Sequence, residues 1–201
     1  MTSVKSNSVK IGFIGLGKLG LPCAEVMAEY YDVAGYDIQT IKTTQPLAIK
    51  SSIEETVKDR DIIFVAVPTP HGPEYGGETP ITDLPVKNFD YSIVADVLKA
   101  MDPHLNKHQL VVLISTVLPG TVRKHLKPLL TNARFIYNPY LIAMGSVKWD
   151  MVNPEMIILG TEDGSETRDA ALMKDIYAPV MKRSEEHTSE LQSRLHLVCR
   201  L

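Results

Sequence analysis

The chain is poor in cysteine, in long apolar runs and in excess charge of either sign. Only Cys23 and Cys199 occur in 201 residues, which excludes a disulfide framework and favours a reducing compartment, the cytoplasm. The longest apolar runs, Ile62–Pro68 and Leu110–Ile114, are far shorter than the roughly 20 residues of a membrane-spanning helix. A net charge of −3 gives no basic surface for phosphate backbones. We therefore expect no membrane partner and no nucleic-acid partner.

Short apolar stretches alternate with amphipathic ones along most of the chain, and 44% of the residues are hydrophobic. Expected strands cover residues 9–14, 32–36, 61–67, 110–115, 134–137 and 156–160, with a weak strand near 48–50. Expected helices cover 19–31, 52–58, 90–101, 120–130 and about 165–181, and residues 71–88 form a loop. Ser52 and Glu55 have the spacing of a capping box. The alternation predicts a single domain, a Rossmann-like doubly wound parallel sheet over residues 9–182.

The two ends of the chain are expected to differ from this domain. Residues 1–8 are polar, lack the apolar core of a signal peptide and are expected to be disordered. Residues 183–201 follow no clear helix or strand period. The eleven residues 183–193 match, codon by codon, the translation of a common sequencing-library adapter. We expect residues 183–201 to be a non-native tail and the natural protein to continue differently beyond Lys182.

A glycine-rich turn follows the first expected strand and opens the first expected helix. It reads Gly15-Leu16-Gly17-Lys18-Leu19-Gly20. In such a string the first glycine permits a tight turn and the second lets the backbone approach a pyrophosphate. The third lets the helix pack on the strand, and the helix N-terminus offers N–H groups and a positive dipole end to phosphates. The string and its context predict a dinucleotide-binding site.

Asp37 follows the second expected strand, about twenty residues beyond the glycines. A carboxylate at that place hydrogen-bonds the adenosine ribose hydroxyls and repels a 2′-phosphate. No arginine directly follows it. The sequence therefore predicts NAD, not NADP, as the cofactor. No metal is expected, because His104 and His108 have the spacing of helical ligands but no third ligand near them.

With further stretches, these residues make the chain resemble the nucleotide-sugar 6-dehydrogenases, the UDP-glucose/GDP-mannose dehydrogenase family. The further stretches are Gly35-Tyr36-Asp37, Val67-Pro68-Thr69-Pro70, Ser115-Thr116-Val117-Leu118-Pro119-Gly120-Thr121, and Asn138-Pro139 through Gly160. The resemblance implies a cytoplasmic oxidoreductase of polysaccharide biosynthesis. It would oxidise the C6 alcohol of a nucleotide sugar to a carboxylate and pass two hydrides to two NAD molecules. It also implies a homodimeric full-length protein, of which this chain is the NAD-binding domain.

The resemblance also assigns roles to residues. It places Val67, Pro68, Thr69 and Ser115 at the cofactor, beside the nicotinamide ribose, and it gives Thr116 a contact with a water or with the reacting sugar hydroxyl. The family's catalytic Lys, Asn and Cys are absent from this chain, so the resemblance implies that the fragment is inactive alone.

One departure from the family falls on its acidic residues. Tyr140 and Met144 stand where the family has two glutamates, the first of them its candidate general base. Tyrosine, with a pKa near 10, cannot accept a proton unaided near neutral pH. Two alternatives therefore stay open: a β-hydroxyacid dehydrogenase relative, which shares the first glycine-rich unit, and a non-catalytic NAD-binding module.

Overall fold

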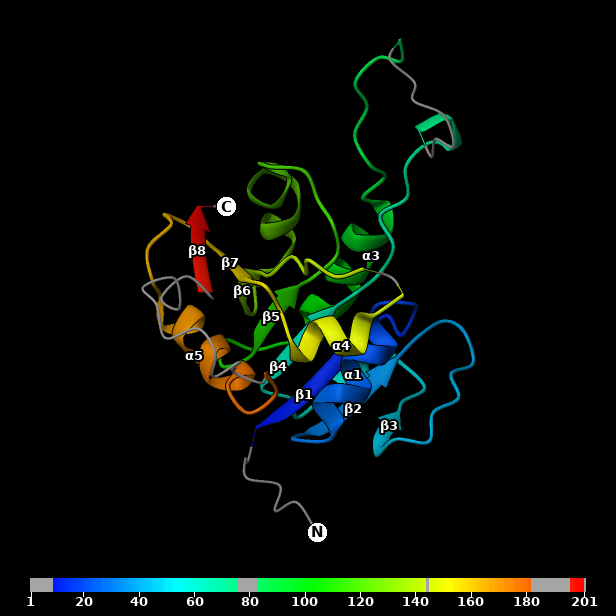
Figure 1. Ribbon diagram of the computed structural model, residues 1–201, viewed down its shortest axis with the longest axis vertical. Coiled ribbons are helices and arrows are strands. Elements are labelled where there is room, and N and C mark those ends of the chain that lie inside the picture. The colour runs from blue at the N-terminus through cyan, green and yellow to red at the C-terminus, as the bar shows by residue number, and fades with distance from the viewer. Residues whose placement is uncertain (1–8, 76–82, 144, 182–195, 201) are drawn as a thin grey trace.

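The computed structural model describes residues 9–75, 83–143, 145–181 and 196–200, which form one open sheet flanked by helices (Figure 1). The strands are β1 (Lys10–Ile14), β2 (Asp32–Tyr36), β3 (Leu47–Ile49), β4 (Ile62–Val65), β5 (Leu110–Leu113), β6 (Arg134–Tyr137), β7 (Ile157–Thr161) and β8 (His196–Arg200). Their order across the sheet is β3-β2-β1-β4-β5-β6-β7-β8. The order reverses between β1 and β4, so the predicted doubly wound, Rossmann-like fold is confirmed. Such sheets bind ligands at this reversal, outside the carboxyl ends of the strands.

The sheet is not parallel throughout, which corrects the sequence-based expectation. β1 to β6 pair in parallel, but β7 pairs antiparallel with β6, with Tyr137 opposite Gly160. A parallel neighbour needs a crossover to the other end of the sheet. The chain between β6 and β7 instead forms α4 (Val147–Val152), a helix that the sequence did not predict, and β7 starts from the edge where β6 ends.

β8 is a second correction, because no strand was predicted in residues 183–201. It pairs in parallel with β7, and α5 (Arg168–Tyr177) lies between them along the chain. The prediction that residues 1–8 are disordered lies outside the described residues. So does the adapter-like stretch 183–193 of the predicted tail.

Helices cover both faces of the sheet. Successive strand residues point to opposite faces, so Ile62 and Phe64 join the core under α1 (Gly20–Ala28), α4 and α5. Ile63 and Val65 join the core under α2 (Ile53–Val57) and α3 (Ser92–Met101). The rings of Phe13 and Phe64 stack across β1 and β4 with their centroids 4.8 Å apart. Burial on both faces explains why the central strands are almost wholly apolar.

The predicted capping box of α2 is confirmed with a shift of one residue. Ser52 Oγ accepts a hydrogen bond from Glu55 N at 3.1 Å. The Glu55 carboxylate reaches back to Ser51, accepting from its backbone N at 3.2 Å and from its Oγ at 2.9 Å. Two N–H groups at the helix start are thereby satisfied.

The predicted α-helix over residues 120–130 takes a different form. Residues Val122–Leu126 make a π-helical turn and Lys127–Leu129 a 3₁₀ turn. Pro128 is the physical reason, because it has no N–H to donate and its ring clashes with the carbonyl four residues earlier in an α-helix.

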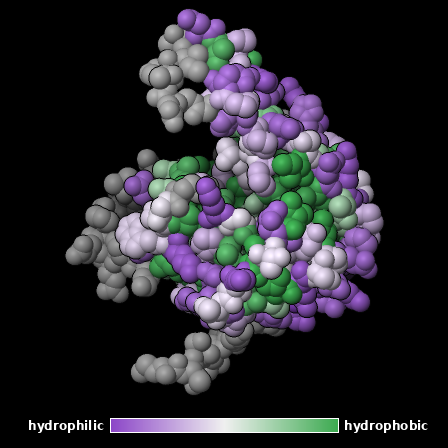
Figure 2. Space-filling model, turned by 90° about the vertical axis from the view of Figure 1, so that its right-hand side faces the viewer, coloured by the Kyte–Doolittle hydropathy of each residue, from purple (hydrophilic) through white to green (hydrophobic). Residues whose placement is uncertain are grey.

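The expected loop over residues 71–88 forms an arm that projects from the body of the molecule (Figure 1). Its described part contains a short 3₁₀ turn, Pro73–Tyr75, and an ion pair of 3.1 Å between Lys87 Nζ and Glu74 Oε1. Figure 2 shows that the arm is mostly hydrophilic, whereas apolar side chains gather on the body below it. In the part of the chain that the structure describes, no helix combines the length and the apolar character needed to cross a bilayer.

Asp102 ties the end of α3 to the turn before β6. Its Oδ1 accepts hydrogen bonds from Thr131 N and Asn132 N, both at 2.8 Å, and its Oδ2 accepts from Thr131 Oγ1 at 2.7 Å. Burial opposes ionisation, but these hydrogen bonds and the charge of Lys107 hold the pKa of Asp102 below its ordinary value of 3.8. The carboxylate form is therefore the one that the folded state favours.

We expect Asp102→Ala to lower the free energy of unfolding at pH 7 by about 1–2 kcal/mol, since several charge-assisted hydrogen bonds are lost. A lowered folded-state pKa contributes stability above the unfolded pKa and loses it as the pH falls through the folded pKa. The difference from wild type should therefore shrink below about pH 4, as urea unfolding at several pH values would show. The exposed Asp96, on α3, provides the control, Asp96→Ala. Equal stabilities of wild type and Asp102→Ala at pH 7 would contradict the assignment.

Candidate dinucleotide-binding site

The glycine loop is pinned between three strands at the carboxyl edge of the sheet. Gly15 follows β1, and its N donates to Tyr36 O at the end of β2 at 2.9 Å. Its φ of +92° lies in the region that favours glycine. A Cβ at Gly15 would lie 2.7 Å from Ala66 O, just beyond β4. The turn therefore requires glycine here for both its backbone angle and its close contact.

The other two glycines differ sharply in their surroundings. A Cβ at Gly20 would lie 1.9 Å from Gly15 O, so the start of α1 packs directly against the turn. A Cβ at Gly17 would meet no heavy atom within 4 Å. The structure thus leaves open space over the residue that was predicted to approach a pyrophosphate.

The N-terminus of α1 faces this space with the chemistry that an anion requires. The first N–H groups of a helix have no partner inside it, and the dipole makes this end positive. The first turn contains no acidic side chain. Lys18 is exposed, whereas Leu16 is buried against β2, where a Cβ at Gly35 would lie 2.9 Å from Leu16 Cδ1. Leu16 therefore anchors the loop, and the backbone of residues 17–20 stays available.

Asp37 comes directly after β2 and lies beside the glycine loop. Its Oδ2 accepts a hydrogen bond from Leu16 N at 2.7 Å, and its Oδ1 accepts from Gln39 N at 2.8 Å. A carboxylate has about four lone-pair sites, so both oxygens can still accept from ribose hydroxyls. Asp37 thus joins the glycine loop to the predicted ribose position.

The loops after β4 and β5 carry the other predicted cofactor residues. Ser115 is buried, and its Oγ donates to Val67 O at 2.7 Å, so this hydroxyl links the two loops. Pro68 and Thr116 are exposed, and Thr69 is half-buried. The structure therefore places both threonines on neighbouring loops at the edge that also holds the glycine turn.

Three residues that the sequence did not point to as site residues hold these loops. Tyr91 Oη accepts from Leu118 N at 3.1 Å, and Tyr137 Oη accepts from Val117 N at 3.4 Å. Asp90, expected only as a helix cap, donates its backbone N–H to Pro70 O at 2.7 Å, while its Oδ1 accepts from Ser92 N at 2.8 Å. No sequence signal identifies these contacts, because each joins residues distant along the chain.

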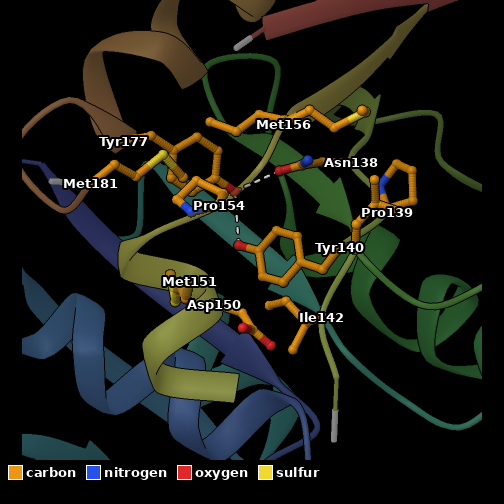
Figure 3. Close-up of a pocket in the computed structure, with 12 residues that line it drawn as sticks. Asn138, Pro139, Tyr140, Ile142, Asp150, Met151, Pro154, Met156, Tyr177 and Met181 are labelled. Carbon is orange, nitrogen blue, oxygen red and sulfur yellow. Dashed lines mark hydrogen bonds between the residues drawn. The ribbon is translucent and has the colours of Figure 1, made fainter. Parts of the chain in front are cut away.

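Tyr140 lies in a pocket between the end of β6, α4 and α5 (Figure 3). Its hydroxyl is 2.8 Å from the hydroxyl of Tyr177, which in turn donates to Asn138 Oδ1. Asn138 Nδ2 donates to Ile158 O at 2.8 Å. Figure 3 shows both tyrosine hydroxyls directed toward one another, with Asn138 beside them. The three side chains form a continuous hydrogen-bonded chain across the end of the sheet.

This environment bears on the proton chemistry of Tyr140. Burial, with a contribution from Tyr177, raises the pKa of Tyr140 well above its ordinary value of 10. The phenolate that a general base requires is therefore even scarcer near neutral pH than in water. Met144, at the second departure from the family, lies outside the described residues. Burial likewise raises the pKa of the Cys23 thiol, so it stays protonated.

The histidines weighed as metal ligands lie at the surface. His104 and His108 are both exposed, and His104 Nδ1 lies 4.0 Å from Glu54 Oε1. Residues 9–75, 83–143, 145–181 and 196–200 contain no group of three side chains that could hold a metal ion.

A doubly wound sheet, a glycine turn with open space at the helix N-terminus, and a carboxylate after β2 define a dinucleotide-binding domain of an oxidoreductase. The NAD binding domain model of the UDP-glucose/GDP-mannose dehydrogenase family matches residues 38–181. The chain belongs to this family, whose cofactor is NAD. The match begins one residue beyond Asp37, so the glycine loop and Asp37 are assigned by the geometry above and not by the match.

Similar curated proteins are sugar-nucleotide dehydrogenases. The UDP-N-acetyl-D-mannosamine dehydrogenase of Methanocaldococcus jannaschii is 26% identical over 88% of this chain and 44% of its own length. The UDP-glucose 6-dehydrogenase of Rickettsia prowazekii is 26% identical over 91% of this chain and 38% of its own length. The chain thus spans less than half the length of these relatives.

Solved structures share the fold. A UDP-glucose dehydrogenase from Pyrobaculum islandicum matches with a TM-score of 0.70 at 22% identity, covering 100% of this chain and 48% of the other. A ternary complex of GDP-mannose dehydrogenase from Pseudomonas aeruginosa matches with a TM-score of 0.67 at 20% identity, covering 84% of this chain and 44% of the other.

Proposed function

We propose that this chain is the cofactor-binding part of an NAD-dependent nucleotide-sugar dehydrogenase of the UDP-glucose 6-dehydrogenase type. The observation that carries the proposal is the open space over Gly17 at the start of α1, with Asp37 beside it. The backbone N–H groups of residues 17–20 would hold the diphosphate, and Asp37 would hold the adenosine ribose. NAD, when bound, supplies the hydride acceptor. UDP-sugars are the substrates in the names of both curated relatives, which supports that substrate class.

The residues at the carboxyl edge support a division of labour. Thr116 is exposed on the loop after β5, where its hydroxyl would contact a water or the sugar hydroxyl that is oxidised. Tyr140 would act in packing, because its hydroxyl is engaged with Tyr177. The proton acceptor and the catalytic Lys, Asn and Cys would then come from the rest of a homodimeric, cytoplasmic protein.

A second candidate is a non-catalytic NAD-binding module. The observation that favours it is the same chain of hydroxyls, because a carboxylate base is replaced by a tyrosine whose proton is held in the interior. The family match leaves the β-hydroxyacid dehydrogenase alternative without support.

Two measurements test the proposal. The chain should bind NAD in a calorimetric titration and should form no NADH with UDP-glucose or UDP-N-acetyl-D-mannosamine. The gene, re-amplified from source DNA past the codon for Lys182, should encode a protein that forms two NADH per sugar oxidised. NAD binding without NADH formation by that longer protein would favour the binding module. Failure of the folded chain to bind NAD would refute both functions.

A further inference from the structure

Three consecutive residues connect the two loops that carry Thr69 and Thr116. We call Phe89, Asp90 and Tyr91 the clamp segment. The backbone N of Asp90 donates to Pro70 O at 2.7 Å. Tyr91 Oη accepts from Leu118 N at 3.1 Å, and the ring centroids of Phe89 and Tyr91 lie 6.4 Å apart. One short stretch before α3 therefore bonds to both loops at once.

The clamp segment acts close to the residues that face the cofactor. Pro70 adjoins Thr69, and Leu118 lies two residues beyond Thr116. The loops are also joined by Ser115 Oγ and Val67 O, but that bond lies deeper, at the ends of the strands. Beyond Thr116, the loop is held at Val117 only by the longer 3.4 Å bond to Tyr137. The contact at Tyr91 is thus the shorter of the two hydroxyl contacts that fix this stretch.

We propose that Tyr91 is a positioning residue, which sets the Thr116 loop against the Thr69 loop to receive the nicotinamide half of NAD. The inference rests on the proposed function. Tyr91→Phe keeps the ring and its packing on Phe89 but removes the acceptor for Leu118 N. The loop then loses one tie near Thr116, whereas the glycine turn and Asp37 lie on other strands and are untouched.

The test compares two ligands by calorimetry on the full 201-residue chain. NAD carries both halves of the dinucleotide, whereas ADP carries the adenosine and the diphosphate but no nicotinamide. We expect Tyr91→Phe to weaken NAD binding about three- to tenfold, the effect of one hydrogen bond, and to leave ADP binding unchanged. Tyr75→Phe is the matched control, because the Tyr75 hydroxyl donates to Pro85 O within the arm. It should change neither affinity.

Other outcomes overturn the inference. Equal losses of NAD and ADP affinity would show that Tyr91 supports the fold generally, and an unchanged NAD affinity would show that the tie is irrelevant to the cofactor. A wild-type chain that binds neither ligand would refute the proposed function and the inference with it. Hydrogen exchange on the wild-type chain gives a second measurement that needs no variant. The amides of residues 117–118 should gain protection with NAD but not with ADP, and equal protection by both would overturn the inference.

Discussion

Replacing Gly17 with alanine is expected to weaken NAD binding roughly ten- to hundredfold and to leave the melting temperature unchanged. No heavy atom lies within 4 Å of the position that the new Cβ would take, so the fold can accept it. The methyl group then occupies the space where the diphosphate approaches the backbone. An intruding methyl group of this kind costs about 1–3 kcal/mol. Calorimetry and thermal unfolding measure the two effects.

Gly20→Ala and Gly145→Ala complete the comparison. The Cβ at Gly20 would lie 1.9 Å from a backbone oxygen, so we expect a loss of about 3 kcal/mol or more of stability. The Cβ at Gly145 meets nothing within 4 Å and lies outside the site, so that variant should match wild type. If Gly17→Ala bound NAD as wild type does, the diphosphate would not lie over the start of α1.

Asp37→Ala is expected to weaken NAD binding by about 10- to 100-fold and to narrow the preference for NAD over NADP. A carboxylate that accepts hydrogen bonds from ribose hydroxyls contributes about 1.5–3 kcal/mol, and its charge repels a 2′-phosphate. The melting temperature should also fall, because Leu16 N and Gln39 N lose their acceptor. Titrations with NAD and NADP, alongside thermal unfolding, provide the measurements.

Two variants separate the contributions of Asp37. Asp37→Asn keeps one acceptor oxygen and should fall between wild type and Asp37→Ala in both affinity and stability. Asp96→Ala removes an exposed carboxylate on α3 and should leave NAD binding unchanged. An Asp37→Ala protein that kept its NAD affinity and its preference over NADP would place the ribose elsewhere.

The cofactor site was predictable because its chemistry sits in consecutive residues at strand ends. Gly15 to Gly20 form one turn, and Asp37 reaches that turn because β1 and β2 are parallel neighbours whose carboxyl ends meet. Buried central strands such as β4 were also predictable, since a short wholly apolar run bounded by polar residues has few other uses.

The errors have equally specific causes. The six-residue α4 is too short to be stable through its own sequence. It is held by packing on α1, where Lys148 Nζ lies 2.7 Å from Glu25 Oε2 and Met151 is buried. The direction of β7 depends on the end of the sheet from which the chain re-enters, and a local pattern carries no such information.

The consecutive residues of this chain specify the alternating strands and helices, the glycine turn and the acidic residue opposite it, since each depends on neighbours a few positions away. The fates of hydroxyl groups follow from packing alone. Tyr140 meets a tyrosine 37 positions away, and Tyr91 meets an amide 27 positions away. Such partners come together only when the sheet closes, because burial requires each polar group to find a partner in three dimensions.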